Sequence, residues 1–166
     1  MAELAWLQSQ KKRPINSKKQ ILKRDMNTFT STRTLPAEPS AIFATIKDPS
    51  RLAKWWGPND FSNRFEVFEF KLGGKWIFDM VGSDGTVYPN ESVFEKIEAD
   101  SLVVIRHVCQ AYFTLTITLE PSAEGTLIHW EQVFADTSVA NAVRHIVEPA
   151  NEQNLDRLTA EVSQSA

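Results

Sequence analysis

Hydrophobic and polar residues alternate along most of the chain between residues 62 and 134. In the run FTLTITLE, Phe113, Leu115 and Ile117 fall on one face and the threonines on the other. Alternation with a period of two is typical of a strand with one buried face. The pattern predicts an early strand at 27–35 and six more at 62–72, 75–81, 87–98, 102–109, 112–120 and 126–134. Glycine, aspartate and serine turn signals between them favour antiparallel neighbours.

Helical spacing interrupts the strands in two places. Pro39 and Pro49 each begin a short segment, and proline is favoured in the first turn of a helix. The second short helix should stop before Gly57-Pro58. A longer pattern at 138–162 predicts one C-terminal helix. That helix contains Pro149, which should bend or divide it because proline lacks a backbone donor.

This order of elements predicts an α+β fold in which the long helix covers the apolar face of an antiparallel sheet. At 100° per residue the helix has one mostly apolar stripe. The stripe contains Val143, Ile146, Val147, Ala150, Asn154 and Leu158. On the strands, the positions that should face it include Trp76, Phe78, Met80, Ile128, Trp130 and Gln132.

The charge is distributed unevenly along the chain. Residues 1–25 hold seven Lys or Arg and two acidic residues, a sum of +5, so the other 141 residues sum to −8 within a total of −3. We therefore expect a basic, poorly ordered N-terminal extension at 1–25 and a single domain at 26–166. An acidic body argues against nucleic acid as the main partner, because phosphate binding needs a basic surface.

Cysteine content and hydropathy concern the compartment. Cys109 is the only cysteine and cannot form an internal disulfide, which is consistent with a reducing compartment. No apolar run reaches the roughly 18 residues needed to span a bilayer. The N-terminus also lacks the order of charged and apolar regions of a signal peptide. A cytoplasmic protein with no membrane span is predicted.

Several segments, taken in order, resemble a known family. They are DPSRLAKWWGP, FEFKLGGKW, VFEKIEADSLV, GTLIHWEQVF and ANEQNLDRL. Together they are similar to the activator-of-heat-shock-ATPase homologues of the START-like, polyketide-cyclase-like superfamily, over roughly 27–162. The resemblance implies a helix-grip fold, with a curved sheet of six to seven strands, a long helix over its concave face and an apolar cavity between them. Glu69 and Lys71 stand where many relatives carry aspartate and arginine.

The implied fold makes the inward positions candidates for the cavity wall. Trp55 and Trp56 would end the second short helix at the rim of the grip, and Gly73-Gly74 would form the turn that lets Trp76 point inward. The predicted cavity-lining residues are Trp55, Trp56, Trp76, Phe78, Met80, Phe113, Leu115, Ile117, Ile128, Trp130, Gln132, Val143, Ile146, Val147, Ala150 and Asn154.

Two of these residues carry amides on otherwise apolar faces. Gln132 and Asn154 either contact a ligand, as a few polar groups do in most small-molecule sites, or satisfy a local backbone group. The second role would suit the region of Pro149, where a carbonyl loses its donor. Both alternatives stay open from the sequence.

Candidate catalytic groups are few. The chain has no phosphate-binding glycine loop and no G-x-S-x-G motif. His107 and Cys109 share a strand face and could ligate a metal, but two ligands do not make a site, and a buried thiol beside a surface histidine is commoner. We predict no metal, no cofactor and no catalytic residue.

Three functions follow from the sequence and the resemblance. The first is binding of a small apolar or aromatic molecule in the cavity. The second is an enzyme of the cyclase or dehydratase type, which would need a titratable group in the cavity, with Glu69, Glu95 or His107 as candidates. The third is a surface that binds a chaperone or another protein.

Overall fold

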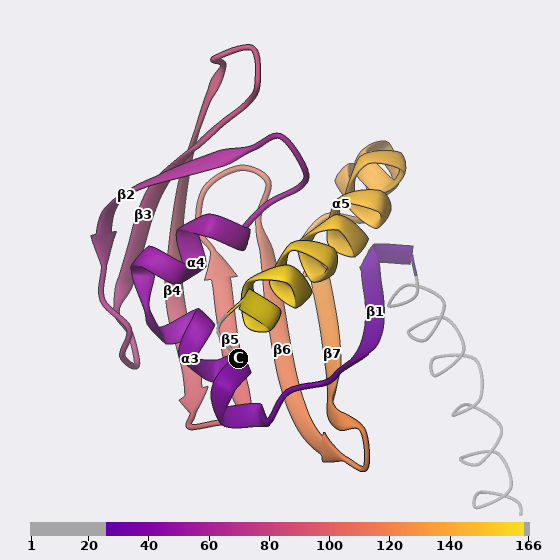
Figure 1. Cartoon of the computed structure of the whole chain (residues 1–166). Helices are drawn as coiled ribbons and strands as arrows, with labels where there is room; N and C mark the ends of the chain where they lie inside the picture. Colours follow the sequence, from indigo (N-terminus) through magenta and orange to yellow (C-terminus); the bar gives the residue numbers. More distant parts are fainter. Residues whose placement is uncertain (1–25, 165–166) are drawn as a thin grey trace, which may run out of the picture.

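A seven-stranded antiparallel sheet and three helices make up residues 26–164, the part of the chain that the computed structural model describes. The sheet curves around α5, and α3 and α4 lie beside this helix on the same face (Figure 1). In chain order the elements are β1 (Thr28–Leu35), α3 (Pro39–Lys47), α4 (Pro49–Trp55), β2 (Ser62–Phe68), β3 (Lys75–Val81), β4 (Val87–Glu98), β5 (Leu102–His107), β6 (Phe113–Ser122), β7 (Gly125–Phe134) and α5 (Thr137–Gln164).

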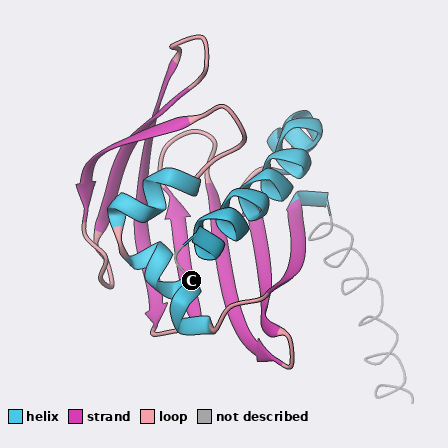
Figure 2. Ribbon diagram, in the orientation of Figure 1, coloured by secondary structure: helices cyan, strands magenta, loops and turns pink. Residues whose placement is uncertain are grey.

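The strands lie in the order β1-β7-β6-β5-β4-β3-β2, so each strand after β1 neighbours the next one in the chain. Figure 2 shows the helices on one side of this meander only. The predicted α+β helix-grip fold is confirmed. Burial in β7 alternates without a break from Gly125 to Phe134, as the period of two predicted.

Two predicted features differ in detail. The strand expected at 62–72 stops at Phe68, because the chain then turns back through hydrogen bonds from Lys71 N to Glu69 O and from Gly74 N to Lys71 O. Pro149 does not divide α5, which runs unbroken from Thr137 to Gln164. A helix can keep a proline when its other backbone bonds and its packing hold it together.

The main core lies between the sheet and α3, α4 and the second half of α5. Trp55, Trp76 and Trp130 are its largest fully buried side chains. Trp76 stacks on Phe78 with ring centroids 4.3 Å apart, and Trp56 meets Trp76 edge-on at 4.8 Å. Such offset and edge-on pairs are the favoured aromatic geometries and stabilise the core beyond simple area burial.

The first half of α5 packs differently from the second. Before Pro149 only Ala140 is fully buried, in a small separate cluster with Phe29 and Phe134. The helix begins at the cap Asp136, whose carboxylate accepts from the backbone N–H of Ser138 at 2.7 Å. Aspartate is one of the residues preferred at this position, because its side chain accepts from an N–H of the first turn that has no partner within the helix.

Two further sequence predictions concern the N-terminal extension and membrane-spanning segments. The basic extension predicted at 1–25 lies outside the described residues. Within residues 26–164, no helix is long and apolar enough to cross a membrane.

Candidate functional site

The segment Trp56-Gly57-Pro58, which we call the tryptophan corner, follows α4 directly. Trp56 ends the helix as its C-cap, with its N–H bonded to Leu52 O at 3.0 Å. Gly57 has φ of +92°, and a Cβ at this position would lie 2.5 Å from Met80 Cε. The left-handed backbone strongly favours glycine, whereas the Met80 methyl is the end of a flexible side chain that could move away. The corner therefore turns tightly against β3.

Arg157 on α5 holds the tryptophan corner in place. Its guanidinium donates to five main-chain carbonyl oxygens at 2.7 to 3.1 Å, those of Lys54, Trp56, Gly57, Pro58 and Phe61. Burial lowers the pKa of Arg157, and the nearby Asp60 opposes that shift. The group nevertheless stays charged at any physiological pH. One side chain thus satisfies most of the carbonyls that a tight turn leaves open.

Asn154 adds the matching acceptor. Its Oδ1 accepts from Gly57 N at 2.7 Å, and its Nδ2 donates to Ala150 O at 3.3 Å. The sequence left open whether this amide serves a ligand or a backbone group near Pro149. The structure shows a backbone role at both ends of the amide: Nδ2 serves the local group Ala150 O, next to Pro149, and Oδ1 serves Gly57 N in the tryptophan corner, 97 residues away.

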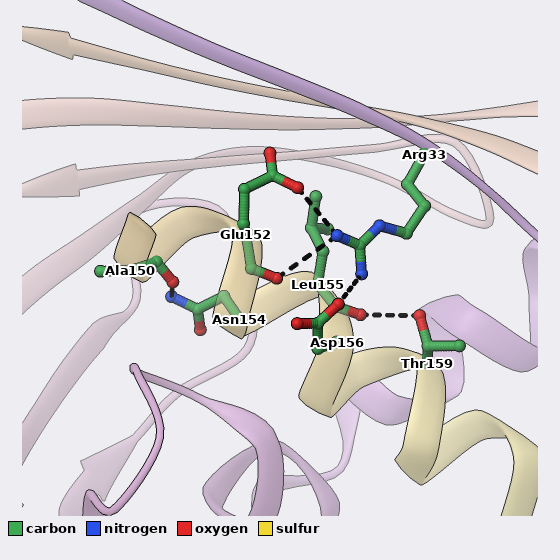
Figure 3. A network of polar contacts seen from close by, with 7 residues as sticks. All are labelled: Arg33, Ala150, Glu152, Asn154, Leu155, Asp156 and Thr159. Carbon is green, nitrogen blue, oxygen red and sulfur yellow. Dashed lines mark hydrogen bonds and ion pairs between the residues drawn. The ribbon is translucent and has the colours of Figure 1, made fainter. Parts of the chain in front are cut away.

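Salt bridges fix the same half of α5 to β1. The Arg33 guanidinium bonds to the carboxylates of Glu152, at 2.8 Å, and Asp156. Figure 3 shows Arg33 reaching from its strand to both carboxylates on neighbouring turns of the helix. Exposed pairs of this kind stabilise a fold only weakly, so they add little to the burial that holds this half of α5.

A cavity of about 490 Å³ lies between α5 and strands β3 to β7, next to the tryptophan corner. Eleven of the predicted lining residues are on its wall: Trp56, Phe78, Met80, Phe113, Leu115, Trp130, Gln132, Ile146, Val147, Ala150 and Asn154.

The other five predicted residues do not line this cavity. They are Trp55, Trp76, Ile117, Ile128 and Val143. Trp55 is fully buried in the core, where its indole N–H donates to Thr45 O at 3.2 Å. The prediction that the buried strand residues lie on the inward face of the sheet was correct. The alternation of residues does not tell, however, where along the sheet the packed core ends and the cavity begins. Of the two adjacent tryptophans, only Trp56 reaches the cavity.

Ile146 has a mixed position. It lies on the cavity wall as predicted, yet 59% of its surface is exposed, which a residue in an apolar stripe should not show. The first half of α5 is less buried than the second, since Ala140 is its one fully buried residue. Tyr88, at the start of β4, is also on the wall and is 49% exposed. The mouth of the cavity therefore has apolar edges.

Several wall residues were missed from the sequence. Asn151 is one position from the predicted stripe, 5% exposed, and donates from Nδ2 to Gln132 Oε1 at 3.1 Å. The sequence did hold a clue to this position, because Asn151 lies beside Ala150 and Asn154 of the stripe and a residue at the border of a stripe can face inward. Other missed wall residues, supplied mainly by β4, β5 and their flanking loops, include Tyr88, Asn90, Ser92, Ile105 and Ala111.

The family can now be identified from the sequence. The profile of the activator of Hsp90 ATPase homolog 1-like proteins matches residues 36–163, more than three quarters of the chain. The chain belongs to this family. No protein with a curated function matches it.

Solved structures of low sequence identity share the fold of this family member. A protein from Nitrosomonas europaea has a TM-score of 0.78 at 16% identity, with 86% of this chain and 97% of that one covered. A protein from Arthrobacter aurescens has a TM-score of 0.77 at 23% identity, with coverages of 84% and 88%. An AHSA1-like protein from Aeromonas hydrophila has a TM-score of 0.69 at 18% identity, with coverages of 83% and 93%. At these identities the likeness shows the fold alone.

His107 is the titratable side chain of this family member that faces the cavity from β5. It is 6% exposed and stacks on Phe113, with ring centroids 4.5 Å apart. Its Nδ1 lies 2.7 Å from Ala111 O and its Nε2 lies 2.9 Å from Asn90 Oδ1. Both partners are acceptors, so a neutral ring satisfies one of them. Burial lowers the pKa of His107, and hydrogen bonds to the backbone partly oppose that shift.

The other two titratable candidates point away from the cavity. Glu69 is exposed and accepts from Lys75 N at 2.9 Å, and Glu95 is exposed and pairs with Arg106. His107 is therefore the one of the three candidates that a bound molecule could reach.

The candidate metal pair also changes. Cys109 Sγ lies 3.4 Å from His107 Nε2, so the two side chains do meet. The histidine is the buried partner and the thiol is half-buried, the reverse of the expectation, because the ring packs on Phe113. Within residues 26–164 no group of three or more His, Cys, Asp or Glu side chains could hold a metal ion.

Proposed function

We propose that this family member binds a small apolar or aromatic molecule in the cavity beside the tryptophan corner. The observation that supports this most is the cavity itself. Its volume is about 490 Å³, and its wall is largely apolar with a few buried amides. Sites for small molecules usually have volumes of about 300–1,000 Å³ and this mixture of groups. Packing defects in protein interiors are much smaller.

The position of Ala150 allows a direct test. Ala150 lines the cavity from α5, so a larger side chain there would occupy the space that a ligand needs. In a packed interior, growing alanine to phenylalanine costs about 1–3 kcal/mol through strain. In an open cavity the new ring buries its own apolar area and offsets that cost.

We expect Ala150→Phe to stay within about 1 kcal/mol of the parent in urea unfolding and to abolish binding of N-phenyl-1-naphthylamine, followed by its fluorescence. The control is Ala160→Phe, at an exposed position on the same helix. This control should bind the probe like the parent. If the parent fails to bind the probe at micromolar concentration, or if Ala150→Phe still binds it, the proposal is wrong.

A second candidate function, an enzyme of the cyclase or dehydratase type, depends on His107. A general acid or base must reach the proton that it moves, and His107 is on the cavity wall. A substrate turned over by the parent, and bound but not turned over by His107→Gln, would support catalysis. The chaperone partner suggested by the family name stays a prediction, because the contacts described above do not single out a surface for it.

A further inference from the structure

The wall of the cavity is uncharged near neutral pH. Among the described residues that line it there is no aspartate, glutamate, lysine or arginine. The titratable side chains on the wall are Tyr88 and His107. Tyrosine is neutral at pH 7, and burial favours the neutral form of His107. A ligand with a formal charge would find no opposite charge on this wall.

The cation beside the tryptophan corner does not change this picture. Arg157 supports the tryptophan corner from behind, is not on the cavity wall, and already donates to five carbonyl oxygens. Moving an ion from water into an apolar site without a partner is strongly unfavourable. A carboxylate, sulfonate or phosphate group should therefore bind poorly in the cavity.

The buried polar groups of the wall point to a hydrogen-bonding ligand. Gln132 and Asn151 are 8% and 5% exposed and share one hydrogen bond of 3.1 Å. That bond uses one carbonyl and one amino group. The other two amide atoms, Gln132 Nε2 and Asn151 Oδ1, make no hydrogen bond to another group of residues 26–164, and neither is completely buried, so both keep some accessible surface. Reversing both amides would exchange the roles and still leave one donor and one acceptor open.

A third polar group lies close by on the same strand. Trp130 is two residues before Gln132 on the inward face of β7, and its ring lines the cavity. Its indole N–H is buried without a partner in the described part of the chain, and because the atom has almost no accessible surface, a molecule in the cavity cannot reach it. Buried polar groups are normally paired, so the open groups of Gln132 and Asn151, rather than this N–H, indicate where a ligand or water binds.

We propose that the cavity selects a neutral molecule, mainly aromatic or aliphatic, whose hydroxyl or amide group donates to and accepts from the Gln132–Asn151 pair. This inference rests on the proposed binding function and names the ligand class for it. A hydroxyl or amide group fits because it can donate one hydrogen bond and accept another, which matches the open acceptor and the open donor of the two amides.

The test of charge uses two probes with the same ring skeleton. N-phenyl-1-naphthylamine is neutral, and 8-anilino-1-naphthalenesulfonate carries a sulfonate on that skeleton. We expect the full chain at pH 7 to bind the neutral probe at least about tenfold more tightly, a difference that Ala150→Phe removes. If both probes bind with similar affinity and Ala150→Phe blocks both, the binding function stands and the preference for neutral ligands is wrong. If neither binds the parent, the binding function itself fails.

The test of the hydrogen bonds compares 2-naphthol with 2-methylnaphthalene as competitors of the neutral probe, because a hydroxyl and a methyl group have similar size. We expect 2-naphthol to displace the probe at a concentration at least about fivefold lower than 2-methylnaphthalene does. The loss of one buried hydrogen bond weakens binding by about this factor. The double variant Gln132→Leu/Asn151→Leu should lose this preference but keep the neutral probe, and it avoids leaving one amide unpaired. Gln110→Leu, at another wall position, is the control and should keep the preference.

Equal competition by the two naphthalenes in the parent would overturn the assignment of the pair as the recognition group. A preference that survives in the double variant would overturn it too. Circular dichroism of the double variant checks that it is folded. If it does not fold, the single variant Gln132→Glu replaces it. At pH 7 a buried carboxylate there should lower the affinity of the protein for the neutral probe and for 2-naphthol. Unchanged affinity for both would contradict the proposal.

Discussion

The two halves of α5 on either side of Pro149 have the same regular backbone but different attachments. After Pro149 the helix buries Asn151, Asn154, Leu155 and Leu158 and holds the tryptophan corner through Arg157. Before Pro149 it buries only Ala140 and passes the cavity mouth with Ile146 exposed. The second half therefore supports the fold, whereas the first half forms one edge of the cavity entrance.

Local stability should follow this division. Segments with few buried apolar contacts open at lower free energy than the core. Arg144, in the first half, lies over the Phe29 ring at 4.5 Å and donates to Met26 O at 2.9 Å, which gives that half a modest anchor on the N-terminal side of the domain. A ligand could enter past this half without disturbing the main core.

The largest contrast should come from two apolar residues of the same predicted stripe. Leu158 is fully buried and Ile146 is 59% exposed. We expect Leu158→Ala to lower the free energy of unfolding by about 3 kcal/mol, because it leaves a cavity in the core. Ile146→Ala should change it by less than about 0.5 kcal/mol. Urea unfolding of both variants measures the difference, and losses of similar size would show that the two halves are equally packed.

The two arginines of α5 provide a smaller contrast. Arg157→Ala removes the guanidinium donor of five carbonyl oxygens, although Trp56 O keeps a bond from Asn63 Nδ2 and Pro58 O keeps one from Phe61 N. The change should cost about 2–3 kcal/mol, as expected for lost hydrogen bonds to a charged group. Arg144→Ala removes the cation–π contact with Phe29, the hydrogen bond to Met26 O and the surface ion pair with Glu148, and should cost about 0.5–1 kcal/mol. The same unfolding measurement applies. A loss for Arg144→Ala that equals the loss for Arg157→Ala would refute the comparison.

The smallest effect should be the pH dependence of the helix cap. The hydrogen bond from the Ser138 hydroxyl, followed by the backbone N–H groups of Ser138 and Val139, lowers the pKa of Asp136. The folded pKa is thus below the unfolded value, so the stabilisation is present above about pH 4 and is lost as the pH falls through the folded pKa. The difference in urea midpoint between the parent and Asp136→Ala should be small at pH 6 and smaller still at pH 3. A difference that does not depend on pH would mean that the ionised carboxylate is not the stabilising group.

The sequence predicted the fold well because strand alternation and helix periodicity are local signals. The unbroken alternation of β7 placed Trp130 and Gln132 on the inward face, as the structure shows. The same signals could not tell that Trp55 lies in the core and Trp56 on the cavity wall. Both residues end the same helix, and the direction of each side chain depends on how the chain turns after them. That turn depends on Gly57 and its contact with Met80.

The partners of the polar groups were beyond prediction for a different reason. Asn154 was correctly placed on the inward stripe, but its partner Gly57 is 97 residues away, and no local pattern records such a distance. Asn151 was missed because the stripe was drawn from apolar spacing, and an asparagine at its border adds nothing to that spacing. Both amides became interpretable only when α5 was placed against the sheet.

The five hydrogen bonds of Arg157 also have a consequence for the order of folding. They join groups that are 96 to 103 residues apart in the chain. Contacts of such separation require closure of a long loop and are costly to form early. The tryptophan corner, and with it one side of the cavity, should therefore be completed only after the strands between have paired. A ligand that needs this wall would slow unfolding and leave the folding rate almost unchanged.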